Sequence, residues 1–284
     1  MSLFILSLMS FPVHAQKGKV VESIIEIGTQ DNHAMDHLDV LCNRIGGRLI
    51  GSDAYDNAVD WTAHMFEKWG LEVWKQEVGE LPVGFNRGPW FGRLIGGDEP
   101  MTLHFATPSY TSGTKGIQRG HVLIEPQSEE EFNRMKHVLK GAWVLVGGIN
   151  NGWPLDHTAK ADSVRNVQKA ENKKIAEENR KIRTENYQNK TDKPLLPIKE
   201  VPGLFYREMV EAGVLGFIQA SEVPIRALYD RNMLRDPNTN FDNLPEVCDI
   251  KLDINQYNTI KRMAKERRDF WLEFDIRNHF KLGP

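Results

Sequence analysis

The sequence predicts a mixed α/β (α+β) fold in which helices come first and short strands with peripheral helices follow. Three observations support this prediction: two amphipathic segments at residues 30–47 and 54–69, a series of short β-like segments between residues 103 and 146, and helices and strands that alternate after residue 204. A chain of 284 residues is long enough for one large domain or two smaller ones.

Composition makes several classes of protein poor candidates. Hydrophobic residues make up 40% of the chain and charged residues 26%, which argues against wholesale disorder and against an integral membrane body. The formal net charge is −3, so no overall positive field exists to attract nucleic acid.

The two cysteines, Cys42 and Cys248, are too few for a disulfide framework. They could pair in an oxidising compartment, but nothing in their spacing favours a pair over two separate buried thiols.

The first 15 residues have the features of a secretory signal peptide. Residues 3–13 are apolar, and this segment is too short to cross a bilayer, which requires about 20 residues. Small residues precede polar ones at Ala15, so we expect cleavage after Ala15 and a secreted or periplasmic mature chain without a membrane-spanning segment. The absence of Lys or Arg before the apolar segment departs from the usual pattern, and a frayed N-terminal helix is the alternative.

Two helices and a strand are predicted after the signal peptide. The first helix covers residues 30–47, with Asp31 as its N-cap and two glycines at its end. The second covers residues 54–69, and Gly70 ends it. Residues 71–78 are predicted to form a strand. The apolar face of the first helix consists of Met35, Leu38, Leu41 and Cys42.

A loop and three short strands are predicted next. Residues 79–92 are rich in glycine, proline and aromatic residues, which indicates a loop whose Trp90 and Phe91 cover another part of the protein. Strands are predicted at residues 103–106, 121–125 and 143–146, where β-like runs are separated by turns that contain glycine and serine.

The remaining elements alternate between helix and strand. Residues 158–187 are rich in Lys, Glu and Asn, and we interpret them as a solvated helix with intrahelical charge pairs rather than as a coiled-coil partner site. A helix at residues 204–212 and a buried strand at residues 214–219 follow. A further helix begins at Asp253, with Gln256 completing a capping-box pattern. Residues 272–277 alternate apolar and charged side chains, as a half-buried strand does.

No motif by itself defines an active site. His37-Leu38-Asp39 has the letters of a zinc motif, but helical residues two apart diverge by roughly 200°, so these side chains cannot share one ion. His33 and His37 share a helix face, yet a catalytic zinc usually takes three ligands from the protein. The glycines of residues 146–152 lack the dinucleotide-binding spacing, and no Gly-x-Ser-x-Gly motif occurs. Residues 129–131 are three glutamates typical of a solvent-facing surface.

Residues 37–78 resemble the opening of the secreted two-zinc exopeptidases of peptidase family M28. This family includes bacterial aminopeptidases and the plasma glutamate carboxypeptidase type. The matching features are a helix, a G-x-R-x-x-G-S turn with an extra glycine at residues 46–52 (GGRLIGS), a second helix that ends in Trp-Gly-Leu, and a strand. In such proteins a protease-associated (PA) domain is inserted after that strand. Residues 141–148, residues 205–220 and the strand that ends at Arg277 look like this insert.

The resemblance implies a domain organisation for the chain. Residues 1–15 would be the signal peptide, and residues 16–92 the helical part and first strand of a zinc-peptidase α/β domain. Residues 93–277 would form a PA-like insert of short strands with peripheral helices, including a charged helical excursion at residues 158–193. Residues 278–284 would be a linker that returns to a catalytic domain outside the chain.

The resemblance also implies an activity for the parent enzyme. It would be a hydrolase, a metalloexopeptidase in which two zinc ions activate water for peptide-bond cleavage. The zinc ligands of the family lie beyond the insert, so we expect this chain to bind no zinc and to be inactive alone. No metal role is assigned to His37 or Asp39. The expected partner is a peptide substrate, which would be bound through the missing catalytic domain, and no nucleic-acid partner is expected.

Three residues of the aromatic loop are candidates for facing the substrate. They are Asn86, Arg87 and Trp90. The Arg87 guanidinium would suit a substrate carboxylate, and a structural salt bridge is the alternative. Aminopeptidase, carboxypeptidase and dipeptidase specificities all remain open. An alternative hypothesis for the whole chain is a stand-alone PA-like module that binds peptides or proteins without catalysis.

Overall fold

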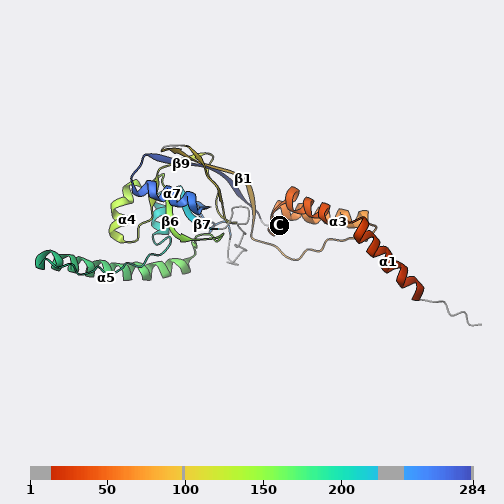
Figure 1. Ribbon diagram of the computed structural model, residues 1–284, viewed down its shortest axis with the longest axis horizontal. Helices are drawn as coiled ribbons and strands as arrows, with labels where there is room; N and C mark the ends of the chain where they lie inside the picture. Colours follow the sequence, from red (N-terminus) through yellow and green to blue (C-terminus); the bar gives the residue numbers. More distant parts are fainter. Residues whose placement is uncertain (1–13, 98–99, 223–239, 283–284) are drawn as a thin grey trace, which may run out of the picture. The chain divides into compact units, whose positions relative to one another are not determined.

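The chain folds as two compact units, and the computed structural model describes residues 14–97, 100–222 and 240–282 (Figure 1). Unit 1 comprises residues 1–48 and 53–75, and unit 2 comprises residues 49–52 and 76–284. Most of the predicted signal peptide lies outside the described residues. None of the helices in the described ranges combines the length and the apolar character that a membrane crossing requires.

Unit 1 consists of helices. They are α1 (His14–Gln30), α2 (Ala34–Asp39), the π-helical turn η1 (Val40–Ile45) and α3 (Asp53–Lys68). The first predicted helix therefore begins four residues later than expected, after His33, whose side chain makes no capping hydrogen bond. Asn32 Oδ1 accepts instead from the Ala34 N–H at 2.8 Å. The second predicted helix is confirmed. It ends at Lys68 and is followed by a turn at Gly70, whose φ of +81° is the left-handed conformation that glycine adopts at low cost.

The prediction of a strand at residues 71–78 is wrong. This segment pairs with no strand of the described chain, and three of its four apolar side chains are exposed. Leu71 is 56% exposed, Trp74 77% and Val78 92%. A strand is stabilised by ladder hydrogen bonds and a buried face, and this segment has neither.

The prediction that Cys42 is buried in a helix stripe is also wrong: Cys42 is exposed, whereas Cys248 is buried, and both thiols are free.

Unit 2 contains two β-sheets, so the fold is mixed α/β. The four-stranded sheet has the order β2-β1-β9-β4 and is antiparallel. The five-stranded sheet has the order β3-β8-β7-β6-β5, in which β5 to β8 are parallel and β3 is antiparallel to β8. The strands of the first sheet are β1 (Val83–Gly96), β2 (Met101–Thr102), β4 (Gln118–Gly120) and β9 (Phe270–Leu282). Those of the second are β3 (Phe105–Ala106), β5 (Val122–Ile124), β6 (Trp143–Ile149), β7 (Gly216–Ser221) and β8 (Cys248–Asp253).

Two apolar cores cover the two faces of the five-stranded sheet. On one face, Leu145, Ile218 and Ile250 pack against the four-stranded sheet and helix α7 (Ile254–Lys265). On the other face, Val144 and Phe217 pack against two short helices. These are α4 (Glu129–Met135), which continues into the turn η2 (Lys136–Val138), and α6 (Tyr206–Glu211). The alternation of apolar side chains between the two cores is what a parallel sheet buried on both faces requires.

The prediction of a loop at residues 79–92 is wrong, because β1 occupies most of it and pairs with β9 from Val83 to Gly96. The glycines that suggested a loop permit close packing instead. A Cβ atom on Gly92 would lie 2.6 Å from the Phe274 ring, and one on Gly84 would lie 2.3 Å from the Gly51 carbonyl oxygen. Strand β9 extends to Leu282, through the residues that the sequence assigned to a linker, and the predicted domain boundaries stay predictions.

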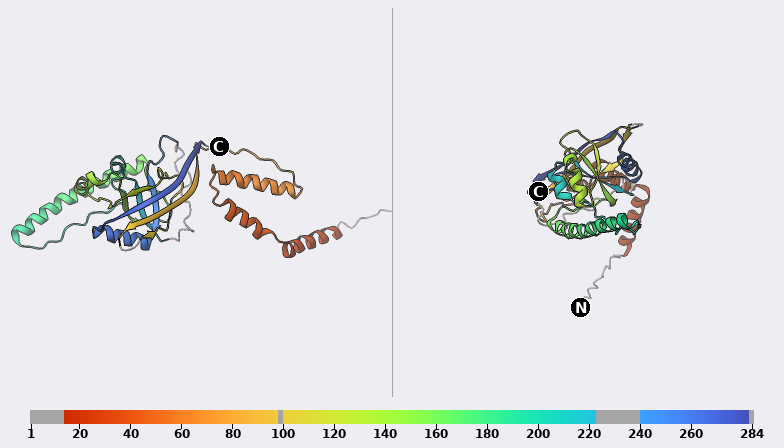
Figure 2. Two further views of the ribbon diagram at one scale, coloured as in Figure 1. Left: turned by 90° about the horizontal axis from the view of Figure 1, so that it is seen from above. Right: turned by 90° about the vertical axis from the view of Figure 1, so that its left-hand side faces the viewer.

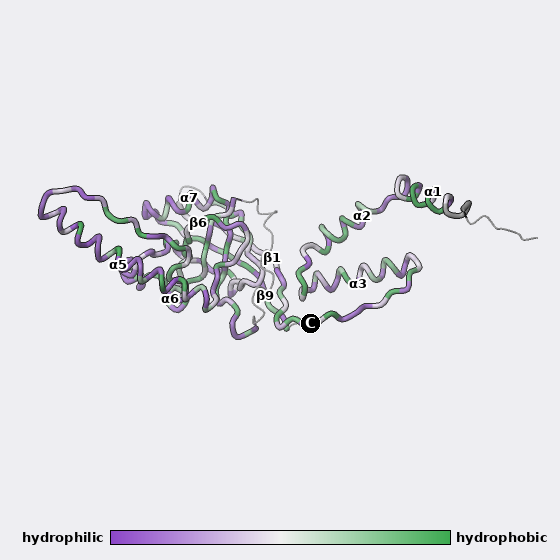
Figure 3. The backbone as a smooth tube through the Cα atoms, turned by 90° about the horizontal axis from the view of Figure 1, so that it is seen from below, coloured by the Kyte–Doolittle hydropathy of each residue, from purple (hydrophilic) through white to green (hydrophobic). Residues whose placement is uncertain are grey.

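Helix α5 (Ala159–Asn189) confirms the predicted charged helix. It projects from the rest of unit 2 (Figure 2) and is mostly hydrophilic (Figure 3). The chain that follows it returns along the helix as an extended segment, residues 191–201, and α5 holds this segment with side-chain amides. Asn179 donates to the Leu196 carbonyl oxygen at 2.8 Å and accepts from the Leu196 N–H at 2.7 Å.

The amides of α5 recur every seven residues, and this spacing has a geometric reason. Asn186 makes the same pair of bonds with Lys193 at 3.0 and 2.9 Å, and Asn172 donates to the Lys199 carbonyl oxygen at 3.0 Å. Seven helical residues rise about 10.5 Å, and three extended residues span about 10 Å, so the two repeats stay in register. We call Asn172, Asn179 and Asn186 the amide ladder.

Helix α7 begins as predicted, at the N-cap Asp253, whose carboxylate accepts from the Asn255 and Gln256 N–H groups. The reciprocal half of the predicted capping box is wrong. The Gln256 side chain instead accepts from the His104 N–H at 2.7 Å and donates to the Thr102 carbonyl oxygen at 2.9 Å. Gln256 therefore ties α7 to the segment between β2 and β3.

Candidate functional site

The three residues predicted to face a substrate all lie on β1 in unit 2. Asn86 is paired with His279 of β9, and the register of the two strands shifts between Arg87 and Trp90. Arg87 Nη2 donates to the Thr107 carbonyl oxygen at 2.8 Å. Trp90 Nε1 donates to the Phe105 carbonyl oxygen at 3.0 Å, and its side chain is 41% exposed. The two side chains thus bind the same neighbouring segment, and a role toward substrate stays a prediction.

The histidine and aspartate of the His-x-Asp sequence contact different groups in unit 1. The His37 ring lies 5.8 Å from the Trp61 ring and 5.3 Å from the Trp69 ring, measured between centroids. The Asp39 carboxylate accepts from Asn43 at 2.8 Å and from the Arg44 Nε–H at 3.2 Å. No three His, Cys, Asp or Glu side chains are grouped to hold a metal ion anywhere in the described ranges. The described residues therefore do not fit a zinc centre.

A cavity of about 550 Å³ lies in unit 2. Among the described residues, its walls come from Tyr110 and from three segments that are distant in the sequence: residues 153–159 before and at the start of α5, residues 206–211 of α6, and residues 242–246 before β8. This volume falls within the range of small-molecule and side-chain binding pockets, about 300–1,000 Å³. We call it the α5–α6 cavity.

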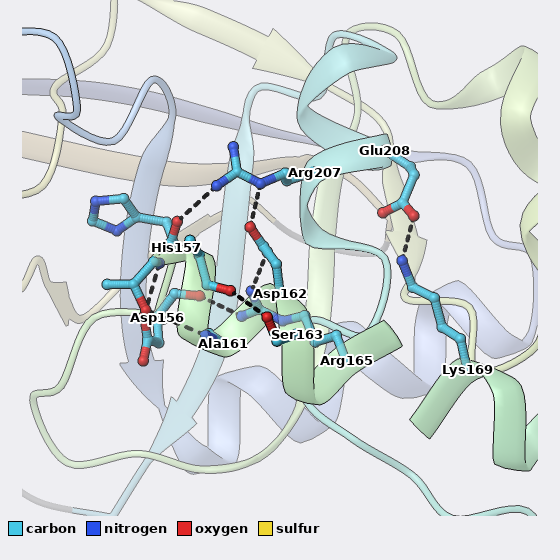
Figure 4. Close-up of polar contacts among 11 residues, drawn as sticks. Asp156, His157, Ala161, Asp162, Ser163, Arg165, Lys169, Arg207 and Glu208 are labelled. Atoms are coloured by element: carbon cyan, nitrogen blue, oxygen red, sulfur yellow. Dashed lines mark hydrogen bonds and ion pairs between the residues drawn. The ribbon is translucent and has the colours of Figure 1, made fainter. Parts of the chain in front are cut away.

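Charged side chains of α5 and α6 form a cluster at the edge of this cavity (Figure 4). Asp162 accepts from two guanidinium groups, since one carboxylate oxygen pairs with Arg207 Nε and the other with Arg165 Nη1 at 3.1 Å. Arg207 Nη2 also donates to the His157 carbonyl oxygen at 3.2 Å. The hydrogen bond to Asp162 raises the pKa of Arg207 above its ordinary value. Arg165 lies over the Tyr206 ring, 5.2 Å from its centroid.

Hydrogen bonds of residues 156–158 cap the start of α5 and join it to another wall of the cavity. Thr158 caps the helix by accepting from the Ala161 N–H at 3.3 Å, and Asp156 accepts from the Thr158 N–H at 2.9 Å. His157 Nε2 lies 3.2 Å from the Asn243 carbonyl oxygen, which connects this segment to residues 242–246. The walls of the cavity are therefore joined to one another by hydrogen bonds.

A buried ion pair on β8 is hydrogen-bonded to the wall of the cavity. Lys251 Nζ lies 2.7 Å from Asp249 Oδ1 and 3.2 Å from Gln219 Oε1, and both charged side chains are buried. Burial lowers the pKa of Lys251, and the neighbouring Asp249 opposes this shift. The second oxygen of Asp249 accepts from the N–H of Leu155, a residue of the cavity wall, at 2.6 Å. Such a pair is costly to break because one partner would leave the other charge buried alone.

Glu125 is a second buried carboxylate in unit 2, at the carboxyl end of β5. Its two oxygens accept from the Gly147 and Gly203 N–H groups, each at 2.7 Å. Burial raises the pKa of Glu125 from its ordinary value near 4.5 to about 7, and the two backbone hydrogen bonds only partly oppose this shift. The Glu125 carboxyl joins the end of β6 to the loop before α6.

Sequence analysis did not identify the α5–α6 cavity. The described residues that form it are Tyr110 and parts of three distant segments, and no spacing within any one of them indicates a site. One local signal was present: Asp156 and Thr158 precede a helix and are residue types that cap helices. That signal defines where α5 begins, and it carries no information about residues 242–246.

The fold defines a mixed α/β protein with a cavity of ligand size in its second unit. No protein-family model matches the sequence, and no curated protein matches it significantly. Among solved structures, a peptidase M28 precursor from Shewanella amazonensis is 13% identical, with a TM-score of 0.44, over 95% of this chain and 52% of that one.

Two further solved structures are similar. An aminopeptidase from Aneurinibacillus sp. strain AM-1 is 9% identical, with a TM-score of 0.38, over 91% of this chain and 48% of that one. A zinc aminopeptidase from Bacillus subtilis is 12% identical, with a TM-score of 0.36, over 87% of this chain and 43% of that one. The chain is thus structurally similar, at low identity, to M28 peptidases and zinc aminopeptidases, and it spans about half the length of those chains. This is the family that the sequence resembles.

Proposed function

We propose that the chain is the non-catalytic part of an exported zinc-dependent exopeptidase of the aminopeptidase type. Unit 1 supplies helices that pack on a catalytic sheet, and unit 2 is a PA-like domain beside the substrate entrance. The complete enzyme binds two zinc ions through residues outside this chain, and these ions activate water for peptide-bond hydrolysis. The chain by itself is inactive toward peptides, and its location is the periplasm or the exterior of the cell.

The observation that carries this proposal is the exposed apolar surface of unit 1. Among the described residues of this unit, only Ala58 is buried. Contiguous exposed apolar surface is typical of regions that pack on another part of a protein or on a partner. The exposed large apolar residues of unit 1 are Val20, Val21, Ile24, Ile25, Ile27, Met35, Leu38, Phe66, Trp69, Leu71 and Trp74.

The sequence pattern supports a catalytic sheet as the partner. The order of helix, G-x-R-x-x-G-S turn and second helix in residues 37–71 resembles the start of two-zinc exopeptidases, whose first helices cover such a sheet. In the structure, the turn at residues 49–52 is held in unit 2, where Tyr110 Oη lies 3.4 Å from the Ile50 carbonyl oxygen. Residues 86, 87 and 90 on β1 are the proposed substrate-facing positions.

The test is expression of the native gene from its own start codon to its own stop codon. We expect the product to bind zinc and to release p-nitroaniline from aminoacyl p-nitroanilides, and we expect residues 1–284 alone to show no turnover. A native product without zinc-dependent hydrolysis would overturn the proposal, as would turnover by residues 1–284 alone.

A pair of variants of the native gene product tests whether unit 1 packs on another part of that protein. Trp74→Ser removes a tryptophan that is 77% exposed in this chain, and we expect it to lower the melting temperature of the native enzyme. Its neighbour Glu72 is also exposed, and Glu72→Ser is the matched control with no expected effect. Equal melting temperatures for the two variants would mean that this segment packs on nothing.

A second candidate function is a binding module without catalysis, and the α5–α6 cavity is the observation that favours it. A binding module needs a formed pocket and no partner domain, and unit 2 has its own apolar cores. If a protein of residues 76–284 binds peptides and the native gene product hydrolyses none, the module is the better description.

A further inference from the structure

Among the described residues that line the α5–α6 cavity, acidic side chains outnumber basic ones. Four of these residues carry carboxylates and one carries a guanidinium, that of Arg207, which is already paired with Asp162. Three of these carboxylates, on Glu211, Asp242 and Glu246, are exposed and form no ion pair within the described part of the chain. A concave site lined mostly by one sign of charge attracts ligands of the opposite sign.

The same cavity also has an apolar wall. Trp153 and Val210 are half-buried in it, and Leu155 and Tyr206 are buried. These side chains offer aromatic and aliphatic surface to a ligand that enters beside the carboxylates. Long basic side chains combine the two properties, because they lay an apolar stem along such surface and keep the charged end with polar groups.

Three basic side chains near the cavity are paired with other groups. Arg207 donates to Asp162 and to the His157 carbonyl oxygen, and Arg165 donates to the same Asp162 carboxylate. Lys169 pairs with Glu208. The charged groups of Arg165, Lys169 and Arg207 are therefore paired with residues of α5 and α6 (Figure 4).

We propose that the α5–α6 cavity binds an ammonium or guanidinium group carried on an aliphatic stem, such as a lysine or arginine side chain of a peptide. Glu211, Asp242 and Glu246 compensate the charge, and the wall at Trp153 contacts the stem. This inference is independent of the proposed zinc enzyme, since the cavity is built within unit 2 alone.

The experiment is a titration of the full chain by isothermal calorimetry at low salt. The probes are the peptide acetyl-Ala-Leu-Lys-Ala-amide and the same peptide with norleucine in place of lysine. We expect the lysine peptide to bind at least tenfold more tightly, and its affinity to fall about fivefold between 20 and 200 mM salt, because screening weakens exposed charge pairs. Equal binding of the two peptides, or no binding of either, would overturn the proposal.

Three single substitutions test whether the lysine peptide binds in the α5–α6 cavity. Glu211→Gln and Glu246→Gln should each weaken the lysine peptide about two- to fivefold, the range expected for an exposed ion pair. Glu177→Gln, an exposed carboxylate further along α5, is the matched control and should leave the affinity unchanged. All three positions are exposed, so the variants should keep the melting temperature of the parent chain. Equal affinities for all three variants would overturn the location.

A further arm distinguishes peptides from free cations as the source of the charged group. Lysine amide and putrescine carry an ammonium group on an aliphatic stem without flanking peptide bonds. Tighter binding of the lysine peptide than of these two compounds supports a peptide ligand, and the reverse order supports a free cation at the same site. Binding of the acidic peptide acetyl-Ala-Leu-Glu-Ala-amide as tightly as the lysine peptide would contradict both.

Discussion

Unit 1 and unit 2 differ in where their apolar side chains lie. Unit 2 buries apolar residues on both faces of its five-stranded sheet, including Trp143, Leu145 and Ile218, none of which is exposed to solvent. Among the described residues of unit 1, only Ala58 is buried. Both units have amphipathic helices, so helix formation alone does not distinguish them. What distinguishes them is a sheet on which the helices can pack, and burial on such a surface supplies most helix stability in proteins.

The largest expected effect comes from separating the two units. A protein of residues 76–284 should unfold in one cooperative transition, because both apolar cores lie within it. A protein of residues 14–75 should show no cooperative transition, since it buries too little apolar surface to offset its conformational entropy. Circular dichroism during heating measures both. A sharp transition in residues 14–75 would show that unit 1 is stable without a partner.

The same substitution in the two units should have very different costs. Leu272 of β9 is fully buried, whereas Leu38 of α2 is 48% exposed. Leu272→Ala should lower the free energy of unfolding by about 2–5 kcal/mol, because it removes buried atoms and leaves a cavity. Leu38→Ala should change it by less than about 0.5 kcal/mol. Urea denaturation of the two variants measures the difference, and similar costs would contradict the contrast between the units.

Unit 2 should also show a pH dependence that originates from Glu125. Because its folded-state pKa is raised to about 7, the folded protein keeps a proton between roughly pH 4.5 and 7 that the unfolded chain has lost. Stability should therefore fall by about 1–3 kcal/mol as the pH rises through this window, and level off above it. Urea denaturation from pH 5 to 8 measures this slope.

Two variants test whether Glu125 causes this dependence of the unfolding free energy on pH. Glu125→Gln cannot titrate, so its unfolding free energy should depend less on pH over the same window, although it should be less stable overall because an amide nitrogen cannot accept one of the two backbone N–H groups. Glu130→Gln alters an exposed carboxylate of α4 and should keep the slope of the parent chain. An unchanged slope in Glu125→Gln would assign the pH dependence to other groups.

The amide ladder should give a smaller and more local effect. Asn179→Ala removes both hydrogen bonds to the Leu196 backbone and should destabilise the returning segment by about 1–2 kcal/mol. Faster hydrogen exchange at the Leu196 amide measures this loss. Asn166→Ala changes an exposed asparagine of the same helix and is the matched control. Unchanged protection in Asn179→Ala would mean that the ladder does not hold the segment.

Prediction from the sequence succeeded for some helices and strands and failed for others: strands predicted at residues 143–146, 214–219 and 272–277 overlap β6, β7 and β9, whereas α1 and α4 were not predicted. The charged helix α5 and the helix α7 begin within a residue of their predicted starts, because capping residues and periodicity are local signals. The errors fall where tertiary pairing decides. Residues 71–78 have a strand-like pattern without a partner strand, and residues 83–92 have a loop-like composition but pair with β9. Strand β8, which no prediction included, forms between β7 and β3.

The candidate site was even less accessible to prediction. The composition of residues 79–92 indicates Asn86, Arg87 and Trp90 as candidates, and the structure places all three on one strand, where Arg87 and Trp90 donate to the backbone of residues 105–107. The α5–α6 cavity depends on residues about 90 positions apart, such as His157 and Asn243, whose contact is a tertiary event. The amide ladder was not predicted either, because the segment that it holds is identified only by the structure.

The sequence by itself determined several elements whose stability is local: the N-cap Asp253 of α7, the helix ends at glycines and the charged character of α5. These depend on side chains within four residues of one another, so their physics is contained in short windows. Only the tertiary structure decided the order of the two sheets, the burial of Lys251 and Glu125, and the walls of the cavity. Those features depend on pairing and desolvation between distant segments, and no local pattern encodes either.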